Sequence, residues 1–327
     1  MNEPLVVTFE VKPRHRQEVA TALGGMGSVV YLTDVTAEER AGVLSSATVV
    51  LARNTGKELL AHEPALLAQA KLIQFMTAGV DFVPLDALPP HVPVASNGGA
   101  YAEMMAEHAM AMALAAAKRL MTEHAALQHG EFNQFKSNKM LAGLTFGVFG
   151  FGGIGVATAR LMRAFGMRVH AVNRRGASDE PTDWIGTTAQ LDELLAVSDV
   201  LLISTPLTRT TIGAIGTREL GLMKADAILI NLARGEVIDE AALYAHLSAH
   251  PAFTACIDAW WIEPIRHGKF RMDYPFMTLP NVIGSPHNSA SSDQSLSIAL
   301  GRAIANCRRV LSGESPLHLI GADERAL

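Results

Sequence analysis

One glycine-rich turn restricts the fold of this chain more than any other feature. The turn lies between an apolar stretch with strand character, residues 144–149, and a helical pattern over residues 156–165. It contains Gly150, Gly152, Gly153, Ile154 and Gly155. In this context glycines permit a tight turn and let the backbone approach a pyrophosphate, while amides at the helix N-terminus face the phosphates. The pattern predicts a dinucleotide-binding unit; a glycine-rich turn that binds nothing is the alternative.

The next expected strand, residues 168–172, ends in a basic turn formed by Asn173, Arg174 and Arg175. This turn comes about twenty residues after the glycines, where an NAD site usually places an acid for the ribose 2′-hydroxyl. Two arginines suit a 2′-phosphate instead, because a guanidinium group binds phosphate oxygens as a rigid fork. The turn predicts NADP(H). The alternative is a solvated basic turn in an NAD enzyme, with Asn173 bonding the ribose.

Short apolar runs with strand character alternate with helical patterns in two series. The first series covers residues 5–9, 29–31, 48–51, 72–75 and 92–95. The second covers residues 144–149, 168–172, 200–204, 227–231, 253–258 and 281–284. Strands separated by helices imply parallel sheets that are covered on both faces. The chain of 327 residues is long enough for two domains, so we expect an α/β fold with two doubly wound parallel-sheet domains.

Two longer helical patterns lie outside these series. One covers residues 101–123, and its most apolar part, residues 109–117, is too short to span a membrane and predicts a buried helix. The other covers residues 292–311 and is followed by a short tail without strand character. Such a tail cannot form a domain, so we expect it to pack back on the first one.

Composition narrows the range of partners. A hydrophobic fraction of 49% with 18% charged residues is typical of a packed globular protein. The net charge of −5 and the absence of a basic block argue against nucleic acid. We find neither a secretory signal nor a long apolar run, so no membrane association is expected. Cys256 and Cys307 are expected to be reduced packing residues, which fits a cytoplasmic location.

Three segments that follow expected strands carry the candidate chemistry. They are residues 231–240, 258–264 and 285–288, which contain Arg234, Glu263 and His287. Singly, each is more often a solvated charge, a turn residue or a loop histidine than a catalytic group. Together they supply what reduction of a 2-oxo acid needs: a cation for the carboxylate, an imidazole that protonates the developing alkoxide, and a carboxylate that keeps the imidazole charged.

These motifs, in this order, resemble the D-isomer-specific 2-hydroxyacid dehydrogenase family over most of the chain. The remaining segments that carry the resemblance are residues 97–119 with Ala106-Glu107-His108, residues 191–195, residues 198–200, Thr205-Pro206-Leu207-Thr208 and Thr211. The resemblance implies a Rossmann nucleotide domain, residues 99–289, inserted into a flavodoxin-like substrate domain, residues 1–98 and 290–327. It implies hydride transfer between NADP(H), or NAD(H), and a small 2-oxo/2-hydroxy acid of the glyoxylate or hydroxypyruvate type, with D specificity.

The resemblance also implies a role for each site residue. Arg234 would clamp the substrate, His287 would act as acid/base with Glu263 as its partner, and the backbone of Ala78, Gly79 and Val80 would touch the substrate carboxylate. The implied cofactor contacts are Gly153 and Ile154 under the pyrophosphate, Asn173 to Arg175 at the ribose, Thr205 with Pro206, Leu232 with Ala233, and Asp258 near the nicotinamide amide. No metal is expected. A homodimer is implied, built around the helix after Tyr101 and an arm near Gly130.

The sequence departs from the family pattern near the expected site. Asn288 follows the histidine where an aliphatic residue is common, Trp260-Trp261 is bulkier than usual, and residues 265–277 form a longer connection. These departures leave the substrate open. A dinucleotide-sensing, corepressor-like binding protein stays an alternative, as does a dehydrogenase of a one-centre anion. The formate branch typically has an amide where Glu263 stands, whereas the phosphite branch keeps the acid.

Overall fold

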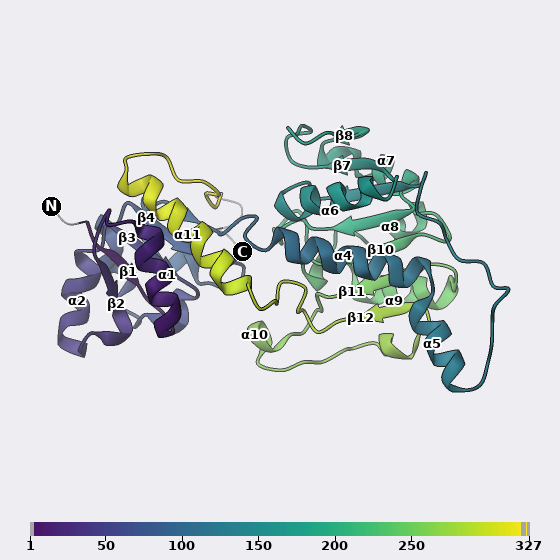
Figure 1. The fold of residues 1–327 in the computed structure, drawn as a ribbon, viewed down its shortest axis with the longest axis horizontal. Coiled ribbons are helices and arrows are strands. Elements are labelled where there is room, and N and C mark those ends of the chain that lie inside the picture. Colours follow the sequence, from purple (N-terminus) through teal and green to yellow (C-terminus); the bar gives the residue numbers. More distant parts are fainter. Residues whose placement is uncertain (1–2, 322–324, 326–327) are drawn as a thin grey trace. The chain divides into compact units, whose positions relative to one another are not determined.

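The computed structural model describes residues 3–321 and 325. The chain divides into two compact units (Figure 1). Unit 1 comprises the described residues up to Tyr101 and those from Ser292 onward, and unit 2 is Ala102–Ser291. The chain therefore enters unit 2 once and leaves it once. The assignment of a substrate domain to residues 1–98 and 290–327, and of a nucleotide domain to residues 99–289, stays a prediction about roles.

Unit 1 is built on a five-stranded parallel sheet with the order β2-β1-β3-β4-β5. This is the flavodoxin-like order expected for a doubly wound domain. The strands are β1 (Leu5–Val7), β2 (Val29–Tyr31), β3 (Val49–Ala52), β4 (Leu72–Phe75) and β5 (Val94–Ala95). The expected strand over residues 92–95 is shorter because Pro93 has no N–H to give to the ladder.

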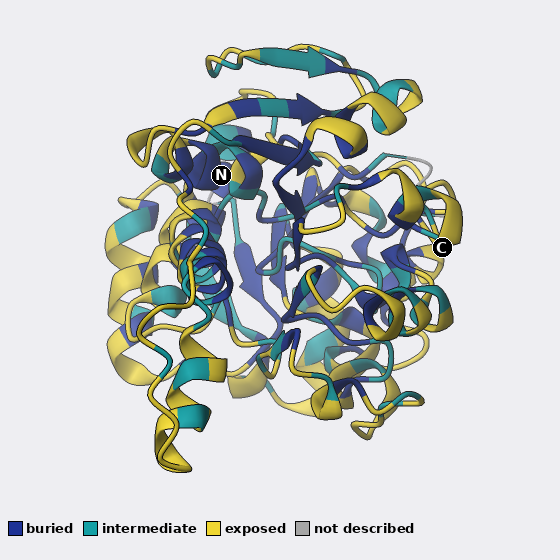
Figure 2. Ribbon diagram, turned by 90° about the vertical axis from the view of Figure 1, so that its right-hand side faces the viewer, coloured by how far each residue is buried: buried dark blue, intermediate teal, exposed yellow. Residues whose placement is uncertain are grey.

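Helices cover both faces of this sheet. Successive side chains of β1 point to opposite faces and are apolar, so each face has an apolar surface to bury. Leu5 and Val7 share one apolar cluster with α1 and α11, whereas Val6 belongs to the cluster that contains Leu44 of α2. The helices are α1 (Pro13–Leu23), α2 (Ala37–Ser45), α3 (Thr55–Glu58) and α11 (Ser295–Leu311), with 3₁₀ turns η1 (Leu32–Asp34), η2 (Pro64–Gln69) and η3 (Leu85–Ala87). In Figure 2, which colours the whole chain by burial, strands are mostly dark blue (buried) and the outer helices carry yellow (exposed) stretches.

Unit 2 is built on a seven-stranded parallel sheet with the order β12-β11-β10-β9-β6-β7-β8. Its strands are β6 (Thr145–Phe149), β7 (Arg168–Val172), β8 (Trp184–Gly186), β9 (Val200–Ile203), β10 (Ile228–Asn231), β11 (Thr254–Ile257) and β12 (Val282–Gly284). The strand order reverses between β6 and β9, which is the switch point where open α/β sheets bind ligands. The fold class expected from the sequence is confirmed for both sheets.

The helices of unit 2 are α4 (Ala102–Ala117), α5 (Leu120–Gln128), α6 (Gly153–Ala164), α7 (Leu191–Val197), α8 (Thr217–Leu222), α9 (Glu240–Ala249) and α10 (Pro264–His267), with 3₁₀ turns η4 (Thr188–Gln190), η5 (Gly235–Val237) and η6 (Phe276–Thr278). Two sequence expectations need correction. The single helix over residues 101–123 is broken at Arg119, whose backbone is left-handed with φ 51°. The strand β8 was missed because Trp184-Ile185 is too short an apolar run to stand out.

Other expectations concern burial. Six of residues 109–117 are buried in α4, but Ala111 is exposed, and the burial extends back to Ala102. No helix among the described residues combines the length and apolar character needed to cross a bilayer. Both thiols, Cys256 and Cys307, are free and buried, and burial raises their pKa, in Cys256 to about 12. The two cysteines are therefore packing residues, as the sequence predicted.

Candidate active site

The three segments with candidate chemistry follow adjacent strands of unit 2. Strands β10, β11 and β12 are parallel neighbours, so their carboxyl ends lie at one edge of the sheet. Arg234 follows β10, Glu263 follows β11 and His287 follows β12. The topology thus brings together side chains that are far apart in the sequence.

His287 and Glu263 form a direct pair. The His287 Nδ1 atom lies 2.8 Å from Glu263 Oε1 and 2.7 Å from Oε2. The backbone amide of Trp260 also donates to Glu263 Oε1, at 2.7 Å. The Glu263 side chain is 10% exposed and that of His287 is 32% exposed. Because Nδ1 faces the carboxylate, Nε2 is the nitrogen left to exchange a proton with a substrate.

The protonation state of Glu263 follows from its surroundings. Burial opposes ionisation, but the hydrogen bond and charge of His287, the Trp260 amide and the positive charge of Arg234 outweigh it and hold the pKa of Glu263 below its usual value. The side chain is therefore a carboxylate at neutral pH. A fixed negative charge beside an imidazole favours the protonated imidazole.

Arg234 is carried by a turn that a buried asparagine shapes. Asn231 Oδ1 accepts from the Ala233 amide at 3.0 Å, and its Nδ2 donates to the Arg234 carbonyl at 2.9 Å. The next residue, Gly235, approaches the other loop so closely that a Cβ would lie 2.5 Å from the Trp260 carbonyl carbon. The Arg234 loop is thereby packed against the loop that ends in Glu263.

The longer connection after Glu263 is fixed by backbone contacts to the loop that carries Glu263. It starts with α10 and is closed by an antiparallel bridge between Ile262 and Arg271. The Glu263 amide donates to His267 Nδ1 at 3.0 Å. The two indole N–H groups are also fixed, that of Trp260 to the Ser285 carbonyl and that of Trp261 to the Ile238 carbonyl, each at 2.8 Å. The bulky Trp pair thus links the loops of all three strands.

Asp258 is fully buried, with 0% exposure. Its carboxylate accepts from the Ser285 hydroxyl, from the Asn288 amide at 3.1 Å and from the Ser289 amide at 3.2 Å. His108 of α4 joins this cluster, with Nε2 3.0 Å from Ser285 Oγ. The sequence placed Asp258 at the cofactor, which stays a prediction, but it did not foresee this cluster. The only signals were that His108 and Ser285 belong to the quoted motifs.

The glycine-rich turn fits a dinucleotide. Gly150 has φ +101°, and a Cβ there would lie 2.4 Å from the Thr205 amide nitrogen, so only glycine is accommodated. A Cβ at Gly155 would lie 2.8 Å from the Gly150 carbonyl oxygen, which explains the close approach of α6. By contrast, a Cβ at Gly152 would meet no described atom within 4 Å. The turn is therefore open at Gly152, just before Gly153 and Ile154 begin α6, where a pyrophosphate would bind.

The other expected cofactor contacts lie on the same edge of the sheet. Thr205 and Pro206 follow β9, next to the switch point, and the Thr211 hydroxyl donates to the Pro206 carbonyl at 2.7 Å. Leu232 and Ala233 follow β10 and are buried. These contacts with a cofactor stay predictions that the loop positions favour.

The Asn173 side chain shapes the basic turn. Its Oδ1 accepts from the Arg175 amide at 2.9 Å and the Gly176 amide at 2.8 Å, and its Nδ2 donates to the Ala177 carbonyl at 2.9 Å. Arg174 and Arg175 are exposed. This geometry weakens the alternative in which Asn173 bonds the ribose, because its amide is already engaged.

Ala78, Gly79 and Val80 follow β4 in unit 1. Asn97 supports the start of this segment, donating from its backbone to the Thr77 carbonyl at 2.8 Å and from Nδ2 to the Met76 carbonyl at 3.1 Å. The segment belongs to a different unit from the loops that carry Arg234, Glu263 and His287. Its contact with a substrate stays a prediction.

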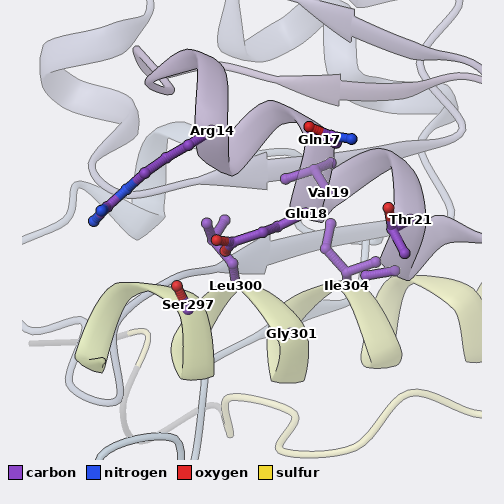
Figure 3. A pocket seen from close by; sticks show the side chains of 10 residues that line it. Arg14, Gln17, Glu18, Val19, Thr21, Ser297, Leu300, Gly301 and Ile304 are labelled. Atoms are coloured by element: carbon purple, nitrogen blue, oxygen red, sulfur yellow. The ribbon is translucent and has the colours of Figure 1, made fainter. Parts of the chain in front are cut away.

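A groove of about 650 Å³ in unit 1 is separate from all these residues. It lies between α1 and α11 and is lined by Val19, Leu300 and Ile304; the Glu18 side chain lies next to Leu300, whereas that of Arg14 extends away (Figure 3). It contains no residue of the expected site.

Similarity to known proteins points to the same kind of protein. Residues 110–289 match the D-isomer specific 2-hydroxyacid dehydrogenase, NAD binding domain. The chain is 31% identical to D-3-phosphoglycerate dehydrogenase of Methanocaldococcus jannaschii over 95% of this chain, but it spans only 58% of that relative's length. It is 32% identical to glyoxylate/hydroxypyruvate reductase B of Pectobacterium carotovorum, over 79% of this chain and 80% of the relative.

A solved structure extends the similarity to both units. The D-isomer specific 2-hydroxyacid dehydrogenase of Xanthobacter autotrophicus Py2, in complex with NADPH and MES, is 25% identical, with a TM-score of 0.79 and 98% coverage of each chain. The chain therefore belongs to the D-isomer specific 2-hydroxyacid dehydrogenases, a family of NAD(P)-dependent oxidoreductases.

Proposed function

We propose that this chain reduces a small 2-oxo acid to the D-2-hydroxy acid, with NADPH as the hydride donor. The observation that carries the proposal is the His287–Glu263 pair, which is held next to the loop of Arg234 at one sheet edge. A sensor that only binds a dinucleotide has no need for a partly exposed imidazole paired with a buried carboxylate.

The residues of this chain divide the work of reduction. When bound, the dinucleotide supplies the hydride, and Gly152, Gly153 and the basic turn would hold it. Arg234 pairs with the substrate carboxylate through its planar fork. Protonated His287 donates its Nε2 proton to the oxygen that was the 2-oxo group, while Nδ1 stays bonded to Glu263. A proton from solvent then restores the imidazolium.

The basic turn supports NADP(H) over NAD(H). Asn173 is engaged in shaping the turn, and the exposed Arg174 and Arg175 suit a 2′-phosphate. The relative from Xanthobacter was solved with NADPH, which agrees with this assignment.

We place the substrate in the glyoxylate and hydroxypyruvate class. The support is the name of the Pectobacterium relative. The test is a panel of small, aromatic and branched 2-oxo acids with NADPH and with NADH. Hydroxypyruvate is the informative member, because its product is chiral and should be the D isomer. Turnover of none of the acids, or turnover of phosphite or formate instead, contradicts the proposal.

We also propose a homodimer that uses α5 and the arm after it. Large apolar side chains are exposed on this segment: Leu120, Met121, Leu127, Phe132, Phe135 and Met140. Phe135 alone is 92% exposed. Several large exposed apolar side chains on one segment favour a protein interface. Sedimentation equilibrium should give twice the chain mass, and a monomer would contradict this assignment.

The two free, buried thiols fit a reducing compartment, so we assign the protein to the cytoplasm. Fractionation of cells that express the chain with its natural ends tests this assignment.

A further inference from the structure

His108, Ser285 and Asp258 form a hydrogen-bonded cluster next to the backbone that follows His287. Ser285 Oγ donates to Asp258 Oδ1, and His108 Nε2 lies 3.0 Å from Ser285 Oγ and 3.8 Å from Asp258 Oδ1. His108 comes from α4, 177 residues away from Ser285 in the sequence. The cluster therefore joins the helix with which the chain enters unit 2 to the loop with which it leaves.

The direction of each hydrogen bond follows from donor and acceptor counts. A serine hydroxyl has one hydrogen, and a carboxylate only accepts, so the Ser285 hydrogen points to Asp258. The imidazole nitrogen near Ser285 must then donate. His108 thus carries a hydrogen on Nε2, and the cluster runs from His108 through Ser285 to Asp258.

Asp258 connects the cluster to the backbone next to His287. Its carboxylate accepts from the backbone amides of Asn288 and Ser289, the two residues directly after the histidine. His287 itself has φ 49°, a left-handed conformation that is rare for residues other than glycine. Such a conformation persists only where its surroundings hold it. The amides bound to Asp258 provide that hold on one side, and the Glu263 pair provides it on the other.

We propose that His108 and Ser285 are positioning residues for the acid/base step. They orient Asp258, which fixes the left-handed backbone of His287 and so directs its imidazole. This inference rests on the proposed reductase activity. A contact between the cluster and the cofactor alone is the competing interpretation, and it predicts a different kinetic effect.

The test compares paired variants of the full chain in NADPH-dependent reduction of hydroxypyruvate. Ser285→Ala removes the hydroxyl and Ser285→Thr keeps it, whereas His108→Leu removes the donor and His108→Gln keeps an N–H. Ser248→Ala and His250→Gln are controls, because both side chains are exposed on or after α9, donate to backbone carbonyls of that helix and lie outside the His108–Ser285–Asp258 cluster. Thermal unfolding of each variant separates loss of fold from loss of rate.

We expect Ser285→Ala and His108→Leu to lower kcat by about 10- to 100-fold, as a misplaced group does, with little change in the KM for NADPH. Ser285→Thr and His108→Gln should recover most of kcat. An unchanged kcat in both loss variants overturns the inference. So does a rise in the KM for NADPH without a fall in kcat, which would assign the cluster to cofactor binding.

A second readout separates this inference from the proposed function. If the unsubstituted protein reduces no 2-oxo acid, the proposed function fails, and the inference is judged on the ¹⁵N-labelled imidazole signals of His287. Ser285→Ala should shift these signals, and Ser285→Thr should leave them near their original position. Identical signals in all three proteins overturn the inference.

Discussion

The two halves of the sheet in unit 2 are built on different principles. Around β6, β7 and β9 the expected cofactor site consists of glycines, backbone amides and exposed arginines. Around β10, β11 and β12 the loops that carry Arg234, Glu263 and His287 are held by hydrogen bonds of the buried side chains of Asn231, Asp258 and Glu263. The first half owes its shape to close backbone packing, as at Gly150. The second half owes its geometry to a network in which Glu263 and Asp258 are the centres.

Because the two halves differ in this way, we expect substitutions in them to have different kinetic effects. Substitutions of Arg234, Glu263 and His287 should lower kcat or kcat/KM for the oxo acid and leave cofactor binding intact, because we propose that these three side chains act on the substrate. In the cofactor half substitutions should change KM for the dinucleotide and leave the chemistry intact. The following variants test this separation, beginning with the largest expected effect.

His287→Ala should cause the largest loss. Removal of the general acid should lower the reduction rate by roughly 10²- to 10⁴-fold, the usual contribution of such a group. NADPH binding, followed by quenching of intrinsic tryptophan fluorescence, should persist. His250→Ala is the matched control. Near-normal turnover by His287→Ala would mean that another group supplies the proton.

Arg234→Lys should have the next largest effect. Lysine keeps the charge but loses the planar fork that pairs with a carboxylate. We expect kcat/KM for the oxo acid to fall by about tenfold or more, equivalent to about 1.4 kcal/mol of transition-state stabilisation. Steady-state kinetics checks it, with KM for NADPH as the internal reference. If Arg234→Lys matches the unsubstituted protein, the clamp acts through charge alone.

Arg174→Ala should have the smallest effect and the opposite kinetic signature. The unsubstituted protein should prefer NADPH over NADH by about tenfold in kcat/KM. The variant should raise KM for NADPH much more than KM for NADH, with kcat nearly unchanged. Parallel assays with the two cofactors measure this. A wild-type preference for NADH would reject the arginine assignment.

The sequence predicts the fold well where local patterns suffice. Apolar runs between helical patterns place all strands except β8, and the order of motifs along the chain places Arg234, Glu263 and His287 after successive strands. The break at Arg119 escapes prediction because Ala- and Met-rich segments favour helix on both sides of it. Local propensity does not show where the chain takes one left-handed residue.

The parts of the site that escape prediction depend on contacts between distant residues. The bond from His108 to Ser285 crosses 177 residues, and no spacing rule connects them. The role of Asn173 in its own turn is local, but its side chain could equally have faced a ribose. The sequence left the long connection without a role. The Ile262–Arg271 bridge ties this connection back to the loop that carries Glu263.

The most direct test of the acid/base pair is the pH profile of keto-acid reduction in Glu263→Gln. The pKa of Glu263 lies below its usual value, so the carboxylate that lies 2.7 Å from His287 Nδ1 is charged at neutral pH. Glu263→Gln removes a negative charge, and such a charge favours a positive charge on a neighbouring group. We propose that reduction uses the protonated form of His287. The account predicts that the alkaline limb of the kcat profile moves to lower pH in Glu263→Gln. An alkaline limb at the same pH in both proteins would contradict it.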